Sequence, residues 1–211
     1  MIRIRHSMVA ATVALLTLLA AHAPAHALNT ATNDLLALDK SLASGWLEAR
    51  VEFYAPPDAK GNAGVPQVYP AKLLFARPGQ FRLVLRPGAK DEYRAAASGG
   101  MVSWIDMATG IGSKDSYDKV VDPFARAMLG VAGAIARFSP AKEIAVNPQY
   151  PLRGAKLTTK VYGSSVVSSK AWFYNDQLSG FEFLLSDNSR VFVSVLTFTP
   201  NVATKPGDFA L

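Results

Sequence analysis

Apolar and polar residues alternate in short segments divided by turn residues, and this pattern limits the chain to a β-rich fold. In residues 46–54, Leu47, Val51 and Phe53 alternate with charged residues, which is the two-residue period of a half-buried strand. Similar segments follow, many of them about ten residues apart, with Pro-Gly or Gly-Gly pairs in between. Connections this short leave no room for parallel crossovers, so the pattern predicts antiparallel strands. The predicted strands are 46–54, 72–77, 80–86, 92–97, 102–107, 111–116, 155–162, 166–174, 180–186 and 190–199.

Two segments have a helical period instead. Residues 28–43 place Ala31, Leu35, Leu38 and Leu42 on one face, and Thr32 or Asn33 is the expected cap. A second helix is predicted to begin at Asp122-Pro123, with an acidic cap and proline in the first position, and to end near Phe138-Ser139-Pro140. A proline-rich loop is expected at 55–70, between the first two strands.

One sheet of about ten strands coils strongly, and two helices are enough to cover one of its faces. The predicted fold class is therefore α+β, mainly β. Its architecture is an incomplete antiparallel β-barrel, a curled sheet with helices covering the concave face. The length of the chain fits one such domain, expected at residues 28–211.

The N-terminus has the three parts of a secretory signal peptide. Arg3 and Arg5 precede an apolar run at 8–20, and small residues end in Ala25-His26-Ala27. An uncleaved membrane anchor is the alternative, but the run is shorter than the roughly 20 residues that a spanning helix needs. We therefore expect residues 1–27 to be a cleaved signal peptide, and the mature protein to be periplasmic.

Composition narrows the chemistry. The chain contains no cysteine, and its three histidines all lie within the segment expected to be removed. This argues against most hydrolase triads, thiol enzymes and zinc or iron sites, so no catalytic residue, metal or cofactor is predicted. Ser116-Tyr117-Asp118-Lys119 fits S-x-x-K, but the chain lacks the K-T-G partner of that enzyme motif. Loss of Arg3 and Arg5 lowers the formal charge from +6 to +4, which suits anionic lipids or an acidic partner but not nucleic acid.

Several short motifs resemble those of the outer-membrane lipoprotein carrier (LolA) family. The most distinctive is Arg77-Pro78-Gly79-Gln80-Phe81-Arg82, directly before an alternating strand. Val102-Ser103-Trp104-Ile105-Asp106 follows in the family's order, although Ile105 replaces the usual aromatic residue. The C-terminal hairpins around Leu178-Ser179-Gly180-Phe181 and Asp187-Asn188-Ser189-Arg190 are also similar. The resemblance implies an unclosed β-barrel with a helical lid, which shields acyl chains in transit through the periplasm.

The resemblance also implies roles for single residues. Arg77 matches the family arginine that contacts the lid, and Phe81 matches a large apolar residue at the cavity. The strand pattern agrees on Phe81, which shares a face with Leu83 and Leu85. For Arg77 the alternative is a solvated turn arginine, and for every apolar candidate it is ordinary core packing. The residues expected to line a lipid cavity are Leu35, Leu38, Phe81, Leu83, Leu85, Trp104, Phe124, Met128, Phe173 and Phe183.

The sequence thus favours a non-enzymatic carrier of lipoprotein acyl chains or another lipid. Its expected partners are an inner-membrane donor complex and an outer-membrane acceptor, and it is expected to act as a monomer. A periplasmic sensor that uses the same fold to recognise lipoproteins or envelope proteins is the main alternative. Catalysis on a lipid or glycan, and a purely structural envelope role, are the remaining classes.

Overall fold

The computed structural model describes residues 30–62, 64–116, 132–133, 135, 140–144, 151–158 and 166–211. It identifies strands over most of these ranges, one α-helix before the first strand and a 3₁₀ turn after the last. The elements are α2 (Ala31–Ser41), β1 (Ser44–Tyr54), β2 (Gln67–Ala76), β3 (Gln80–Leu85), β4 (Tyr93–Ser98), β5 (Met101–Asp106), β6 (Ile111–Ser116), β7 (Pro140–Ile144), β8 (Leu152–Leu157), β9 (Val166–Tyr174), β10 (Gln177–Leu185), β11 (Arg190–Pro200) and η1 (Pro206–Phe209).

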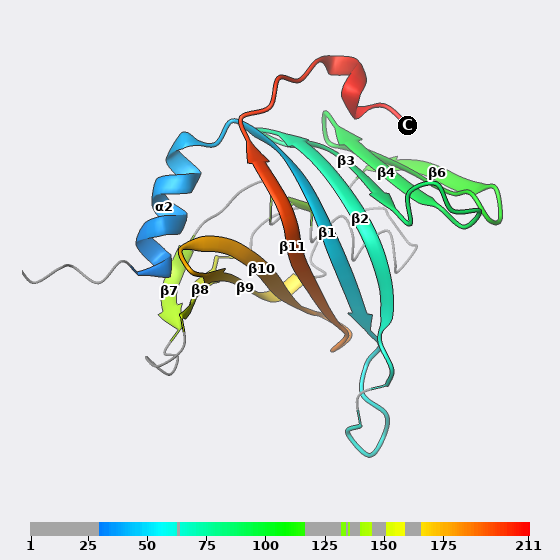
Figure 1. Ribbon diagram of the computed structural model, residues 1–211. Helices are drawn as coiled ribbons and strands as arrows, with labels where there is room; N and C mark the ends of the chain where they lie inside the picture. The colour runs from blue at the N-terminus through cyan, green and yellow to red at the C-terminus, as the bar shows by residue number, and fades with distance from the viewer. Residues whose placement is uncertain are drawn as a thin grey trace, which may run out of the picture.

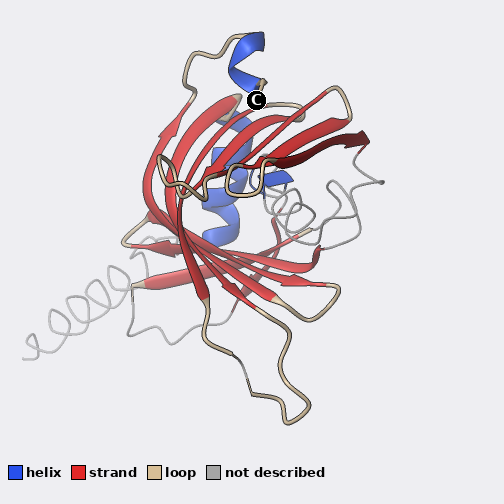
Figure 2. Ribbon diagram, turned by 90° about the vertical axis from the view of Figure 1, so that its right-hand side faces the viewer, coloured by secondary structure: helices blue, strands red, loops and turns tan. Residues whose placement is uncertain are grey.

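All the strands belong to one antiparallel sheet, in the order β6-β5-β4-β3-β2-β1-β11-β10-β9-β8-β7. The two end strands, β6 and β7, do not pair, so the sheet curls without closing (Figures 1 and 2). The predicted incomplete barrel is confirmed, with eleven strands in place of about ten. The extra strand is β7, which the sequence did not reveal because it is short and begins with a proline, a residue tolerated at a sheet edge.

The sheet consists of two meanders joined by its first and last strands. Strands β1–β6 form one meander and β7–β11 the other, and β1 pairs with β11 over nearly its whole length. Because strands that follow one another in the chain lie side by side within each meander, this topology needs no crossover. It places α2, which precedes β1, against the second meander, where it contacts β7, β8 and β9 (Figure 1).

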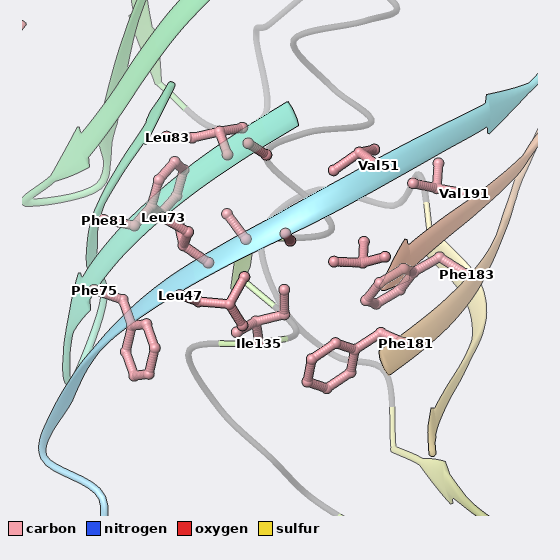
Figure 3. Packing of buried hydrophobic residues seen from close by; sticks show 14 of the residues in the cluster. Leu47, Val51, Leu73, Phe75, Phe81, Leu83, Ile135, Phe181, Phe183 and Val191 are labelled. Atoms are coloured by element: carbon pink, nitrogen blue, oxygen red, sulfur yellow. The ribbon is translucent and has the colours of Figure 1, made fainter. Parts of the chain in front are cut away.

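Alternate residues of the strands point to the concave side and form the core. Phe75, Phe81, Phe181 and Phe183 are each at most 1% exposed, and they extend from both meanders into the same interior (Figure 3). Ile135, which lies in a helical stretch between β6 and β7, is buried in the same cluster. The concave face is therefore packed in its centre, as expected for an apolar surface removed from water.

Several predicted boundaries were wrong. Strand β2 begins at Gln67, inside the predicted loop 55–70, because Val68 and Tyr69 pair with β1 and the carbonyl of Pro70 accepts a hydrogen bond from Arg86. The other large shifts occur in the second meander, where β8 begins at Leu152 rather than residue 155 and β10 begins at Gln177 rather than residue 180. Residues 159–162 of the predicted strand 155–162 lie outside the described residues. The early start of β10 follows from a two-residue turn, since Asn175 and Asp176 both have positive φ, as in a type I′ hairpin.

The helix predictions have different outcomes. The first helix, predicted at 28–43, spans Ala31–Ser41 and is capped by Thr30, whose hydroxyl accepts from the Asn33 amide, rather than by Thr32 or Asn33. The second predicted helix, from 122 to about 138, lies mostly outside the described residues. Within it, residues 132, 133 and 135 are helical. The expected signal peptide at 1–27 also lies outside the described residues, so it stays a prediction.

Truncation of one core side chain tests the position of the core. Phe183→Ala is expected to lower the free energy of unfolding by about 3–5 kcal/mol, because Phe183 is fully buried and leaves a cavity. Val167→Ala is the control on β9; Val167 is 58% exposed, and a change of at most about 0.5 kcal/mol is expected. Urea unfolding followed by circular dichroism measures both, and equal losses in the two variants would contradict this core.

Candidate functional site

Helix α2 is fastened to the sheet at its N-terminus by Glu143 of β7. The Glu143 carboxylate accepts from the backbone amides of Ala31 and Thr32 at 3.1 and 3.0 Å, and from the Thr32 hydroxyl at 2.7 Å. These amides belong to the first turn, where a helix has no internal partners for its N–H groups and where its dipole favours a negative charge. A residue from the edge of the sheet thus satisfies the start of the helix.

One turn further along, Arg153 of β8 holds the same helix. Its guanidinium pairs with Asp34 of α2 at 2.6 Å and with Asp176 of the β9–β10 turn, also at 2.6 Å. The guanidinium also lies 5.9 Å from the centre of the Phe173 ring. Arg153 therefore connects α2, β8 and the β9–β10 turn in one cluster.

The C-terminal end of α2 is held from both meanders. Arg77, in the turn between β2 and β3, donates to the Asp39 carbonyl oxygen at 2.7 Å and to the Asp39 carboxylate at 2.6 Å. Asn201, just after β11, donates to the Ser41 carbonyl at 2.9 Å and accepts from the Ala43 amide at 2.8 Å. The predicted lid-contact residue Arg77 thus lies against α2 itself.

Between these attachments, one side of α2 and the neighbouring strands border a cavity of about 650 Å³. We call this cavity the helix groove. Its walls come from one side of α2 and from β9, β10 and β11, and most of the lining side chains are apolar. The lining residues are Asp34, Ala37, Leu38, Ser41, Phe173, Asp176, Gln177, Leu178, Val195, Leu196, Phe198 and Pro200.

The groove lies where β10 and β11 separate. Their pairing ends at Gly180 and Ser194, although β11 continues to Pro200 alongside β1. Each strand has an extra residue at this point: Ser179 is skipped in the pairing of β10 with β9, and Leu196 in the pairing of β11 with β1. Such bulges bend and twist a strand, so they direct the two strands apart.

Gly180 allows the strands to meet closely just before they separate. A methyl group added to Gly180 would lie 2.6 Å from the carbonyl oxygen of Val193, closer than such atoms approach in proteins. The last pair of the β10–β11 ladder therefore requires glycine at this position.

A second hollow lies on the concave face of the first meander. We call this hollow the mouth pocket. Its volume is about 390 Å³, and its wall contains Tyr69, Arg86, Tyr93 and Trp104. The Tyr93 and Trp104 rings stack with their centres 5.8 Å apart, and the Arg86 guanidinium lies 4.7 Å from the centre of the Tyr69 ring. Arg86 also pairs with Asp91 at 2.6 Å. The wall includes fewer apolar side chains than that of the helix groove, and it is already structured by contacts among its own residues.

A third hollow, of about 370 Å³, has cationic and acidic residues in its wall, including Arg82, Arg94 and Glu92. Glu92 accepts from the Gly88 amide at 2.5 Å and pairs with Arg94. The hydrogen bond from Gly88, and then that from Arg94, lowers the pKa of Glu92 below its ordinary value. Glu92 is thus held in its charged form, which suits a fixed structural pair.

The predicted cavity residues divide into three groups. Leu38 and Phe173 line the helix groove, and Trp104 lines the mouth pocket. Phe124 and Met128 lie outside the described residues. The remaining predicted residues are buried in the core cluster, where ordinary packing accounts for them: Leu35, Phe81, Leu83, Leu85 and Phe183.

Sequence reasoning missed the part of the groove formed by Leu178, Val195 and Phe198. These residues lie in or beside strands that were predicted, but which face of a strand is concave depends on its pairing partners. Phe198 pairs with Leu47, which is 1% exposed in the core, and this places Phe198 on the concave side. The alternation of Leu47 with charged residues was the available signal for the buried face of β1. The β1–β11 register was needed to apply that signal to Phe198.

Two further observations concern the described part of the chain. Its Asp and Glu side chains form no cluster of three or more that could hold a metal ion. No helix within it has both the length and the apolar character needed to cross a membrane.

No family model and no curated protein matches the sequence. Among solved structures, the chain is similar to a LolA superfamily protein from Nitrosomonas europaea, with 10% identity, a TM-score of 0.48, and coverage of 87% of this chain and 98% of that one. It is also similar to a DUF1329 family protein from Desulfovibrio piger, with 9% identity, a TM-score of 0.44, and coverage of 85% and 95%. At these identities the likeness concerns the fold, and no residue role passes from either protein to this chain.

Removal of the Glu143 carboxylate tests how α2 is held. Glu143→Ala leaves the amides of Ala31 and Thr32 without their acceptor, and the free energy of unfolding is expected to fall by about 1–3 kcal/mol. Faster hydrogen exchange of these two amides is expected as well. Lys142→Ala, at the exposed neighbouring position on β7, is the control. Unchanged exchange at Ala31 and Thr32 in the Glu143 variant would contradict this attachment.

Proposed function

We propose that the protein is a periplasmic carrier that shields the acyl chains of a lipoprotein or another lipid and delivers them to an outer-membrane acceptor. The helix groove is the observation that carries this proposal. It is a mostly apolar cavity of about 650 Å³ on a concave face whose centre is already filled. Cavities of about 300–1,000 Å³ with apolar walls are typical ligand sites.

The chemistry of the groove suits a ligand that is held without reaction. Leu38, Phe173, Leu178, Val195 and Phe198 offer apolar surface. Each methylene group moved from water to such a surface contributes about 0.8 kcal/mol to binding. An acyl chain therefore gains most of its affinity from burial alone, and a carrier of this kind needs no catalytic group.

In this proposal the ligand is released by competition. An acceptor with a better apolar site takes the acyl chain, and the protein responds by a shift toward a state in which the groove is open. A donor complex in the inner membrane would load the groove by the same exchange.

A variant that fills the groove tests the proposal. Ala37 is an exposed residue of α2 that lines the groove, so Ala37→Trp is expected to occupy the space of the ligand without disturbing the core. Binding of a fluorescent fatty acid, measured by titration with the mature protein, is expected to weaken by about tenfold or more, because several buried methylenes are displaced.

Leu36→Trp is the matched control on the same helix. Leu36 is 43% exposed and is not among the groove residues, so this variant should bind the fatty acid like the unchanged protein. Equal binding by both variants would remove the groove as the site. Failure of the unchanged protein to bind any acyl probe, together with no lipid adduct in native mass spectrometry of the periplasmic form, would contradict the carrier function.

A further inference from the structure

The C-terminal part of β11, beyond Ser194, is a strand edge within the sheet. Beyond Ser194, β11 pairs with β1 on one side only, and among the described strands it has no partner on the other side. Residues 195–199 therefore direct the N–H and C=O groups of one edge toward the space between β10 and β11. An edge of this kind is a template for an added strand.

The composition of this edge differs from that of the two outer edges. Strand β6 carries Lys114 and Asp115, and β7 carries Pro140, Lys142 and Glu143, which are residues that prevent strand addition. Residues 195–199 read Val-Leu-Thr-Phe-Thr, with neither charge nor proline, and all of them except Leu196 are of types that favour strands. Leu196 is 69% exposed on this edge. Among the described strands, this inner edge therefore lacks the protection that the two outer edges have.

The same edge forms one wall of the helix groove. Val195, Leu196 and Phe198 line the groove, and α2 lines it from the other side between Asp34 and Ser41. The seven steps from Asp34 to Ser41 correspond to ~10 Å at a rise of 1.5 Å per residue. Extended chain advances about 3.4 Å per residue, so the groove accommodates about three residues of an added strand.

The charged residues of the groove lie at one end. Asp34 and Asp176 flank the single guanidinium of Arg153, which leaves one excess negative charge, and the Asp176 side chain is 79% exposed. An extended peptide that is uncharged within the groove, with a basic residue beyond its acidic end, is complementary to this arrangement.

We propose that the helix groove binds the peptide segment attached to an acyl chain, by addition of that segment as a strand to residues 195–199 of β11. The inference rests on the proposed carrier function and specifies its cargo as an acylated polypeptide rather than a free lipid. The acyl chain lies on the apolar floor of the groove, while backbone hydrogen bonds to β11 hold the adjoining residues whatever their side chains are. Backbone recognition of this kind serves cargo proteins of different sequence.

Three probes distinguish binding of the acyl chain alone from binding that also adds a peptide strand to β11. They are free palmitate, a palmitoylated peptide of four uncharged residues followed by a lysine, and the same lipopeptide with N-methylated backbone amides. Binding to the mature protein is measured by calorimetry. The lipopeptide is expected to bind about tenfold tighter than palmitate, and N-methylation should remove that gain because the methylated amides cannot donate. Amides within 195–199 should exchange more slowly with the lipopeptide than with palmitate.

A charged residue on the edge provides a test from the protein side. Leu196→Lys should abolish the gain of the lipopeptide over palmitate, with both probes measured on this variant, because a charged side chain on a strand edge opposes strand addition. Val167→Lys, at a 58% exposed position on β9, is the matched control and should retain the gain.

The outcomes separate this inference from the proposed function. Equal affinity for palmitate and both lipopeptides would overturn strand addition and leave the carrier function standing. Failure of all three probes to bind would overturn both. A dimer in native mass spectrometry of the free protein that dissociates in Leu196→Lys would assign the edge to a second copy of the chain, and would also overturn the inference.

Discussion

The structure depends on the need to cover the concave face of a sheet that does not close. Eleven strands curl around an apolar interior, and the two end strands remain unpaired with each other. Helix α2 covers part of this face with Ala31, Leu35 and Leu42, each at most 4% exposed. Polar contacts from both meanders fix its ends, through Glu143 and Arg153 at one end and Arg77 and Asn201 at the other. Apolar burial thus supplies the attachment, and the polar contacts determine the position.

The helix groove and the packed core result from different features of the chain. The core follows from regular alternation, which directs Phe75, Phe81, Phe181 and Phe183 to one side of the sheet. The helix groove lies instead where the regular pattern is interrupted, at the bulges of Ser179 and Leu196. A bulge bends its strand, and these two bulges lie just beyond the last β10–β11 pair, Gly180 and Ser194. Together they are enough to separate β10 from β11 in a sheet that is otherwise continuous. Backbone irregularity, rather than a set of small side chains, places the cavity.

This difference explains which features could be predicted from the sequence. Period-two alternation between turn residues identified most strands, and the resulting curled sheet is correct, because both signals are local. The expected cavity residues Phe81, Leu83 and Leu85 share a face as predicted, but the long-range packing places them in the core. Val195 and Phe198 were missed because a bulge and a register between strands about 150 residues apart are not local properties. Strand parity indicates two faces, but pairing decides which one is concave.

The attachment of α2 also indicates how a ligand would enter the groove. Lifting the helix away would expose Leu35 and Leu42, each of which contributes about 1.5–3 kcal/mol when fully buried. Of the helix residues that line the groove, Leu38 is the one large apolar side chain, while Ala37 and Ser41 have little apolar surface to lose. The gap between α2 and β11 is therefore the less costly route, and the exposed Leu196 lies beside it. On this argument, the ligand enters sideways along β11, past a helix that stays anchored by its buried face.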